Sequence, residues 1–182
     1  MSGPGGVGKG SLVEELVAAD PALWLSRSWT TRAPRLGEHE GAYHFVDRAT
    51  FEEAIAADRF LEWAEFLGQL YGTPVPGAPP GRDVVLEIDV QGAAQVMDSC
   101  PDAMTIWLVA PSADVQSARL RARGDSEEGV SRRVELGRQE DRVGRRLAAH
   151  VVVNDDLSRA VSEVRGIIEE RRGNARRPPQ GA

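Results

Sequence analysis

The stretch GPGGVGKGS, from Gly3 to Ser11, lies almost at the front of the chain. Gly3, Gly8 and Lys9 fit the spacing G-x-x-x-x-G-K, in which backbone N–H groups curl around phosphate oxygens and the lysine reaches the outer phosphates. The apolar pattern that follows is typical of a helix, whose positive N-terminal end favours an anion. The predicted ATP-binding residues of this phosphate loop are Gly3, Pro4, Gly5, Gly6, Val7, Gly8, Lys9, Gly10 and Ser11.

Two details of the phosphate loop bear on its chemistry. Lys9 is the single lysine among 22 lysines and arginines, which indicates a position where a compact ammonium fits better than a broad guanidinium. Gly10 occupies the position where a Mg²⁺-binding serine or threonine is usual, and Ser11 comes one residue later. Two interpretations remain open: Ser11 binds the metal directly, or Ser11 contacts phosphate while waters complete the Mg²⁺ shell.

The composition sets the class of protein. A chain of 182 residues fits one domain with small inserted lobes. A net charge of -6 argues against general nucleic-acid binding, and no segment has the apolar length of a membrane span or signal peptide. Cys100 is the only cysteine, which excludes an internal disulfide. We predict a cytoplasmic monomer or homodimer without nucleic-acid or membrane partners.

Apolar strands alternate with helical patterns along the rest of the chain. Strands are predicted at 84–89, 104–109 and 151–153, an arginine-rich helical segment at 115–147, and an amphipathic helix at 157–171. This alternation predicts an α/β fold with a parallel sheet flanked by helices. Further extended segments are predicted at 25–31 and 43–46, and a further helix at 49–57. Residues 60–66 follow and are dense in aromatics and carboxylates.

Five segments resemble those of guanylate kinases, in family order and over nearly the whole chain. They are SWTTRAPRLGEHEGAYHF (Ser28–Phe45), FLEWAEFLGQLYGTP (Phe60–Pro74), LEIDVQGAAQV (Leu86–Val96), RLRARGDSEE (Arg119–Glu128) and VVVNDDL (Val151–Leu157). The resemblance implies a P-loop nucleoside monophosphate kinase that uses ATP with Mg²⁺ to convert GMP, and dGMP, into the diphosphate. It also implies three parts. These are a core of residues 1–27, 81–117 and 150–173, a small mixed GMP-binding lobe of residues 28–80, and a helical lid of residues 118–149, with a disordered tail at 174–182.

The segment from Ser28 onward contains a candidate phosphate clamp. Arg32 and Arg35 suit a single phosphate, although an isolated pair would more readily be a solvated turn. Tyr43 and Tyr71 add neutral phenol donors. The resemblance assigns all four to the GMP phosphate, with Glu38 as a carboxylate that orients the arginines.

The guanine base offers N1–H and N2–H₂ donors beside an O6 acceptor. Glu62 and Asp89 can accept those donors, and the hydroxyls of Ser28 and Thr73 can donate to O6. Adenine would turn its bare N1 toward a carboxylate, so such a site rejects it by about 10⁴ or more. The alternatives are a surface charge for Glu62 and a position facing Mg²⁺ for Asp89, which shares the end of its strand with Glu87.

The arginine-rich segment resembles the lid of the family. Guanidiniums that close over the transferred group stabilise its spread negative charge, whereas an exposed helix would use them in i,i+4 pairs. Asn154 is expected on the adenine side of ATP, or as a cap at the end of its strand. The residues expected to act in catalysis are Lys9, Arg32, Arg119, Arg123 and Arg133.

The family carries a hydrophobic strand before the phosphate loop, but only Met1 and Ser2 precede Gly3 here. We expect the natural product to begin several residues earlier. If it begins at Met1, we expect a weakened sheet, a poorly fixed loop and low activity. Two other functions stay open: a related kinase of a sugar phosphate, which would not need the four base-reading residues, and a non-catalytic guanylate-kinase-like binding module.

Overall fold

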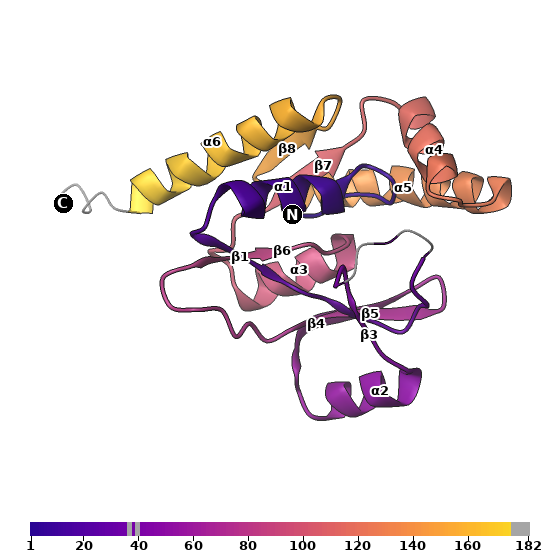
Figure 1. The fold of residues 1–182 in the computed structure, drawn as a ribbon, viewed down its shortest axis with the longest axis horizontal. Coiled ribbons are helices and arrows are strands. Elements are labelled where there is room, and N and C mark those ends of the chain that lie inside the picture. The colour runs from indigo at the N-terminus through magenta and orange to yellow at the C-terminus, as the bar shows by residue number, and fades with distance from the viewer. Residues whose placement is uncertain (36–37, 39–40, 176–182) are drawn as a thin grey trace.

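The computed structural model describes residues 1–35, Glu38 and residues 41–175, and it has a mixed α/β architecture (Figure 1). The helices are α1 Lys9–Ala19, α2 Arg48–Ala56, α3 Val90–Ser99, α4 Ala113–Ala122, α5 Glu127–Leu147 and α6 Leu157–Ala175. The strands are β1 Leu23–Ser26, β2 Trp29–Thr30, β3 His44–Phe45, β4 Phe60–Phe66, β5 Gln69–Pro74, β6 Asp83–Leu86, β7 Ile106–Val109 and β8 His150–Val153.

Two parallel strand pairs form the centre of the molecule. β1 pairs with β6 and β7 pairs with β8, both in parallel. Ser2 joins the two pairs through parallel bridges to Ile88 and Trp107, its N–H donating to the carbonyl of Ile106 at 2.9 Å. An apolar cavity of about 390 Å³ lies beside Met1 and Ser2, between β6 and β7. The phosphate loop therefore starts where the carboxyl ends of β6 and β7 meet.

One hydrophobic core holds the parallel strands against two helices. α1 and α6 pack against each other (Figure 1), and their apolar faces cover β7 and β8. Helical spacing puts Leu12 and Leu16 on the buried face of α1, and Val164 and Ile168 on that of α6. The buried residues of this core are Val7, Leu12, Leu16, Leu23, Ile106, Leu108, Val152, Ala160, Val164 and Ile168.

A second sheet forms the other half of the molecule, with strand order β3-β2-β5-β4 and α2 beyond it (Figure 1). β4 and β5 are antiparallel and are joined at Leu67 and Gly68, both in left-handed conformations. α3 packs against β4, and Asp89 caps α3 by accepting from the N–H of Gly92 at 2.8 Å. Because Asp89 is this cap, its carboxylate is fixed between the two sheets.

The helix α5 packs along the phosphate loop and β7 through two glycines. A Cβ on Gly137 would lie 3.0 Å from Cβ of Pro4, and a Cβ on Gly144 would lie 2.4 Å from the ring of Trp107. The indole N–H of Trp107 donates to Asp141 at 2.8 Å, on the same helix. Since these glycines carry no side chain, the helix backbone approaches the phosphate loop directly.

The predicted elements are confirmed with shifted ends, and several predictions are corrected. The segment 115–147 is two helices, because Gly124 adopts a left-handed turn and Ser126 caps a new helix. α3, β4 and β5 were not predicted as separate elements. α6 continues through 174–175, so the expected tail boundary is wrong there, and positions 176–182 lie outside the described residues. Among the helices of the described part, none combines the length and apolarity needed to cross a bilayer.

Candidate active site

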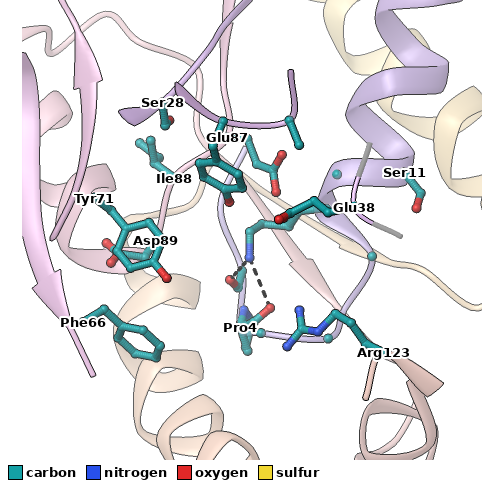
Figure 2. A pocket seen from close by; sticks show the side chains of 18 of the residues that line it. Pro4, Ser11, Ser28, Glu38, Phe66, Tyr71, Glu87, Ile88, Asp89 and Arg123 are labelled. Atoms are coloured by element: carbon teal, nitrogen blue, oxygen red, sulfur yellow. Dashed lines mark hydrogen bonds between the residues drawn. The ribbon is translucent and has the colours of Figure 1, made fainter. Parts of the chain in front are cut away.

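A cleft of about 780 Å³ separates the phosphate loop from the second sheet. Figure 2 shows Ser28, Tyr71 and Asp89 on one side of it and Pro4 and Arg123 on the other. Its wall is built from the phosphate loop, the ends of β1 and β6, strands β4 and β5, and helices α4 and α5. Two kinds of recognition group thus face each other: main-chain amides of a glycine-rich loop, and charged side chains of a sheet.

The phosphate loop is fixed from inside by Lys9. Its ammonium donates to the carbonyls of Gly3 at 2.6 Å and Pro4 at 3.2 Å (Figure 2). Gly8 has φ of 89°, and a Cβ there would lie 2.5 Å from Nδ2 of Asn154, so this position requires glycine. An ammonium has three N–H donors, which leaves one for a ligand phosphate.

Carboxylates partly offset the effect of burial on the ammonium of Lys9. Burial lowers the pKa of Lys9, and the negative charges of Glu87, Glu140 and Asp89 oppose that shift. Burial also raises the pKa of Glu87, which Lys9 moderates. Glu140 comes from α5, one turn after Gly137, and burial raises its pKa to about 7 against the opposing charge of Lys9. Glu140 was not predicted from the sequence.

Asn154 and Arg119 hold the phosphate loop from the side of β8 and α4. Asn154 is buried, and its Nδ2 donates to the carbonyl of Val7 at 2.9 Å. Arg119 donates to the carbonyls of Val7 at 3.2 Å and Asn154 at 2.9 Å. Both side chains line the cleft, while the side chain of Val7 points into the core. The structure gives both residues contacts that support the loop, whatever part they play toward ATP.

The predicted phosphate clamp is assembled on the opposite wall. Glu38 accepts two hydrogen bonds from the guanidinium of Arg32, one of them at 2.8 Å, and accepts from the backbone N–H of Arg35 at 3.0 Å. The Arg32 guanidinium lies 4.9 Å from the ring centre of Tyr43, whose ring is 6.2 Å from that of Tyr71. The hydrogen bond from Arg32 holds the pKa of Glu38 below its ordinary value, so Glu38 stays ionised and orients Arg32.

The predicted base-reading group lies on β4, β5 and the start of α3. Glu62 is 6% exposed, and burial raises its pKa to about 7, although a hydrogen bond from Thr73 opposes the shift. Oγ of Ser28 and Oγ1 of Thr73 are 3.3 Å apart, with Thr73 fully buried behind the wall. A Cβ on Gly92 would lie 2.4 Å from Oε2 of Glu62. The carboxylate of Glu62 is therefore positioned by the backbone of α3.

The arginines of α4 and α5 meet at one carboxylate. Arg123 donates to Asp125 at 2.7 Å, and Nε of Arg133 lies 3.4 Å from the same oxygen. The Arg133 guanidinium lies 5.9 Å from the ring centre of Phe66. Both arginines line the cleft, on the side of the phosphate loop.

Most predicted residues are brought together in one cleft. Val7 and Thr73 do not line it, and Ser11 is exposed on the first turn of α1, at the rim. Sequence reasoning missed Glu140 and Asp125, two of many carboxylates in an arginine-rich segment. The inward face of α5 could have been found from small or apolar residues spaced seven apart, which are Val130, Gly137 and Gly144 and are buried in the structure.

Comparisons with known proteins point to one family. The family model described as "Guanylate kinase" matches residues 1–171. The chain belongs to the guanylate kinase family. A guanylate kinase of Neisseria meningitidis serogroup A is 48% identical over 174 residues, which cover 92% of this chain and 84% of the relative. A guanylate kinase of a Synechococcus species is 45% identical over 170 residues, 90% of each chain.

A solved structure extends the comparison to three dimensions. The crystal structure of a guanylate kinase from Anaplasma phagocytophilum superposes with a TM-score of 0.75 at 27% identity, covering 93% of this chain and 82% of that one. The predicted resemblance to guanylate kinases and the α/β kinase fold are both confirmed.

Proposed function

We propose that this guanylate kinase family member transfers the terminal phosphoryl group of ATP to GMP, giving ADP and GDP. The observation that carries the proposal is the pairing of a phosphate loop with a buried carboxyl group, Glu62, across one cleft; when ionised, that group only accepts hydrogen bonds. A phosphate loop alone indicates any nucleotide, whereas Glu62 and Asp89 suit the N–H donors of guanine. The proposed recognition groups address base and phosphate rather than the ribose, so dGMP is included.

The proposed mechanism is alignment with electrostatic stabilisation. The main-chain amides and Lys9 bind the triphosphate, while Arg32, Arg35 and the two tyrosines bind the acceptor phosphate. The GMP phosphate is largely dianionic near pH 7 and attacks without a general base. Arg123 and Arg133 stabilise the charge that spreads over the moving group, with Arg119 and Asn154 supporting the loop. The proposed parts of the enzyme are the core of residues 1–27, 81–117 and 150–173, the acceptor lobe of residues 28–80 and the lid of residues 118–149.

Kinases of this kind generally use Mg²⁺ with ATP, and the residues present fit that use. Among the described residues, no three His, Cys, Asp or Glu side chains are grouped to hold a metal. This suits an ion bound mainly by phosphates and water, as Mg²⁺ usually is in kinases. Ser11 and Glu87 would hold it there, Glu87 packing beside Gly10 at the start of α1. Bound Mg²⁺ supplies neutralisation of charge on the phosphates.

The experiment that tests the proposal is a coupled assay of ADP release with ATP and Mg²⁺. GMP, dGMP, AMP and a ribosyl phosphate are compared as acceptors under identical conditions. We expect turnover with GMP and dGMP, and at least about 10⁴-fold lower kcat/KM with AMP. Equal activity on AMP would overturn the base-reading argument. Turnover of the ribosyl phosphate alone would favour a sugar-phosphate kinase, and binding without turnover would favour a non-catalytic module.

A further inference from the structure

Asp125 occupies the corner between α4 and α5. Its Oδ2 lies 2.7 Å from Nη2 of Arg123 and 3.4 Å from Nε of Arg133. The Asp125 side chain is only 14% exposed, and the two arginines are 33% and 19% exposed. One half-buried oxygen thus joins an arginine at the C-terminal end of α4 to an arginine of α5.

The corner itself is rigidly built. The backbone N–H of Asp125 donates to the carbonyl of Leu120 at 3.2 Å, and Gly124 supplies the left-handed turn between them. The guanidinium of Arg133 also lies over the ring of Phe66, and a Cβ built on Gly5 of the phosphate loop would lie 3.5 Å from its Nη1. The backbone hydrogen bond and the turn therefore fix the position of the Asp125 carboxylate. That carboxylate in turn fixes the two arginines that contact it.

The helix does not need this carboxylate. Ser126 caps α5, its Oγ accepting from the N–H of Gly129 at 3.2 Å, and Glu127 and Glu128 provide the acidic first turn. Asp125 lies outside the helix and directs its charge sideways to the arginines. A capping role is already filled, so the contacts of Asp125 point to another purpose.

The electrostatics favour a permanent charge at Asp125. Burial alone would raise its pKa, but the hydrogen bond from Arg123 and the positive charges of Arg123, Arg133 and Arg35 outweigh burial and lower it. The carboxylate is thus ionised throughout the neutral range. Each guanidinium has five N–H donors in a planar fork, so one contact with Asp125 leaves the others available.

We propose that Asp125 is a positioning residue that holds Arg123 and Arg133 together so that both donate to the same phosphoryl group. The inference rests on the proposed function, in which those two arginines act on the transferred group. Without the shared carboxylate, two like charges at this corner repel each other and each long side chain samples other rotamers. Fixing them before the reaction places the stabilising charge without reorganisation during transfer.

The test compares Asp125→Asn with the full-length wild-type chain in the GMP assay. The amide keeps the shape of the side chain and removes its charge. We expect kcat to fall by about 10- to 100-fold because the arginines lose their shared anchor, with KM for GMP and ATP nearly unchanged. Asp125→Glu, which restores the charge, should recover part of the loss. Glu127→Gln is the matched control: Glu127 pairs with Arg121 at 2.7 Å on the exposed surface, and kcat should not change.

A double-mutant cycle separates positioning from simple loss of structure. If Asp125 acts through Arg123, Asp125→Asn should cost much less in an Arg123→Ala background than in the wild type. Equal costs in both backgrounds, unchanged kcat for Asp125→Asn, or no recovery with Asp125→Glu would each overturn the inference. Loss of folding in Asp125→Asn, measured by thermal unfolding, would overturn it as well. If the wild type is inactive on GMP, the proposed function itself is contradicted. If the wild type is active and any of these outcomes is found, only the role of Asp125 is contradicted.

Discussion

The two walls of the cleft achieve recognition in different ways. The phosphate loop uses main-chain groups, and its one cation, Lys9, is already bonded to the carbonyls of Gly3 and Pro4. The acceptor wall uses side chains, and one of them, Glu62, is buried with its pKa raised to about 7. The buried cation of the first wall is supported by the negative charges of Glu87, Glu140 and Asp89, whereas the buried carboxylate of the second wall faces the like charge of Asp89.

The difference shows where specificity and stability compete. A main-chain cradle binds the phosphates of any nucleotide, and the carboxylates buried beside it, Glu87 and Glu140, face the opposite charge of Lys9. Base reading needs an acceptor held away from water, which costs folding free energy until guanine supplies its donors. At the acceptor wall, the buried Glu62 should therefore lower the free energy of unfolding as pH rises, and conservative substitution there should change both stability and base recognition.

The largest effect is expected for Lys9→Met on the phosphate-loop side. Loss of the only ammonium removes a charge that meets the outer phosphates, so kcat should fall about 1,000-fold. GMP affinity, measured by calorimetry without ATP, should change little because Lys9 belongs to the phosphate loop and not to the acceptor wall. A parallel loss of GMP affinity would show that the two walls are not separable.

Glu62→Gln should separate activity from stability. The amide presents an N–H₂ group where guanine needs an acceptor, so kcat/KM for GMP should fall about 100-fold. The folded state binds the Glu62 proton more tightly than the unfolded state, so wild-type stability falls as pH rises from 4.5 to about 7. The variant should escape this cost and gain up to about 3 kcal/mol at pH 8 in denaturant unfolding.

The same reasoning gives a control within the Glu62 experiment. Below pH 4.5 Glu62 is protonated in both folded and unfolded chains, so the variant and the wild type should show nearly equal free energies of unfolding. A stability gain that is the same at pH 4 and pH 8 would contradict the buried charge as its cause.

Gly92→Ala should displace the carboxylate of Glu62 from the side of α3. Its Cβ would lie 2.4 Å from Oε2 of Glu62, so the carboxylate must shift and KM for GMP should rise about tenfold. Gly166→Ala is the matched control, because Gly166 is also a helical glycine and has no atom within 4 Å of a built Cβ. The control should keep KM and gain about 0.5–1 kcal/mol of stability. An unchanged KM in Gly92→Ala would show that Glu62 tolerates displacement.

Glu140→Gln should give the smallest effect at neutral pH. Its negative charge supports the protonated form of Lys9, so the variant should lose activity at a lower alkaline pH than the wild type. Turnover at pH 7 should be nearly unchanged, because Glu87 and Asp89 still support Lys9. The pH profile of kcat tests this, and an unshifted alkaline limb would contradict a link between Glu140 and Lys9.

The sequence predicted the two walls better than the lid that joins them. The phosphate loop and the segments around Ser28 and Glu62 carry distinctive residue types, and the described residues place them in one cleft. Asp125 and Glu140 could not be singled out, because an arginine-rich helix contains many carboxylates and solvated pairs use the same residues. α3 was missed although Asp89 and Gly92 have the spacing of an N-cap, since the motif had been assigned wholly to binding.

The close packing at Gly137 and Gly144 has a mechanical consequence. The close packing of Gly137 on Pro4 and of Gly144 on Trp107 holds the C-terminal half of α5 against the core. Arg119, bonded to Val7, ties α4 to the same support. Nearer the N-terminus of the same helix, Val130 is 2% exposed and the guanidinium of Arg133 lies over the ring of Phe66. We therefore expect α5 and the phosphate loop to move as one rigid body when nucleotides bind.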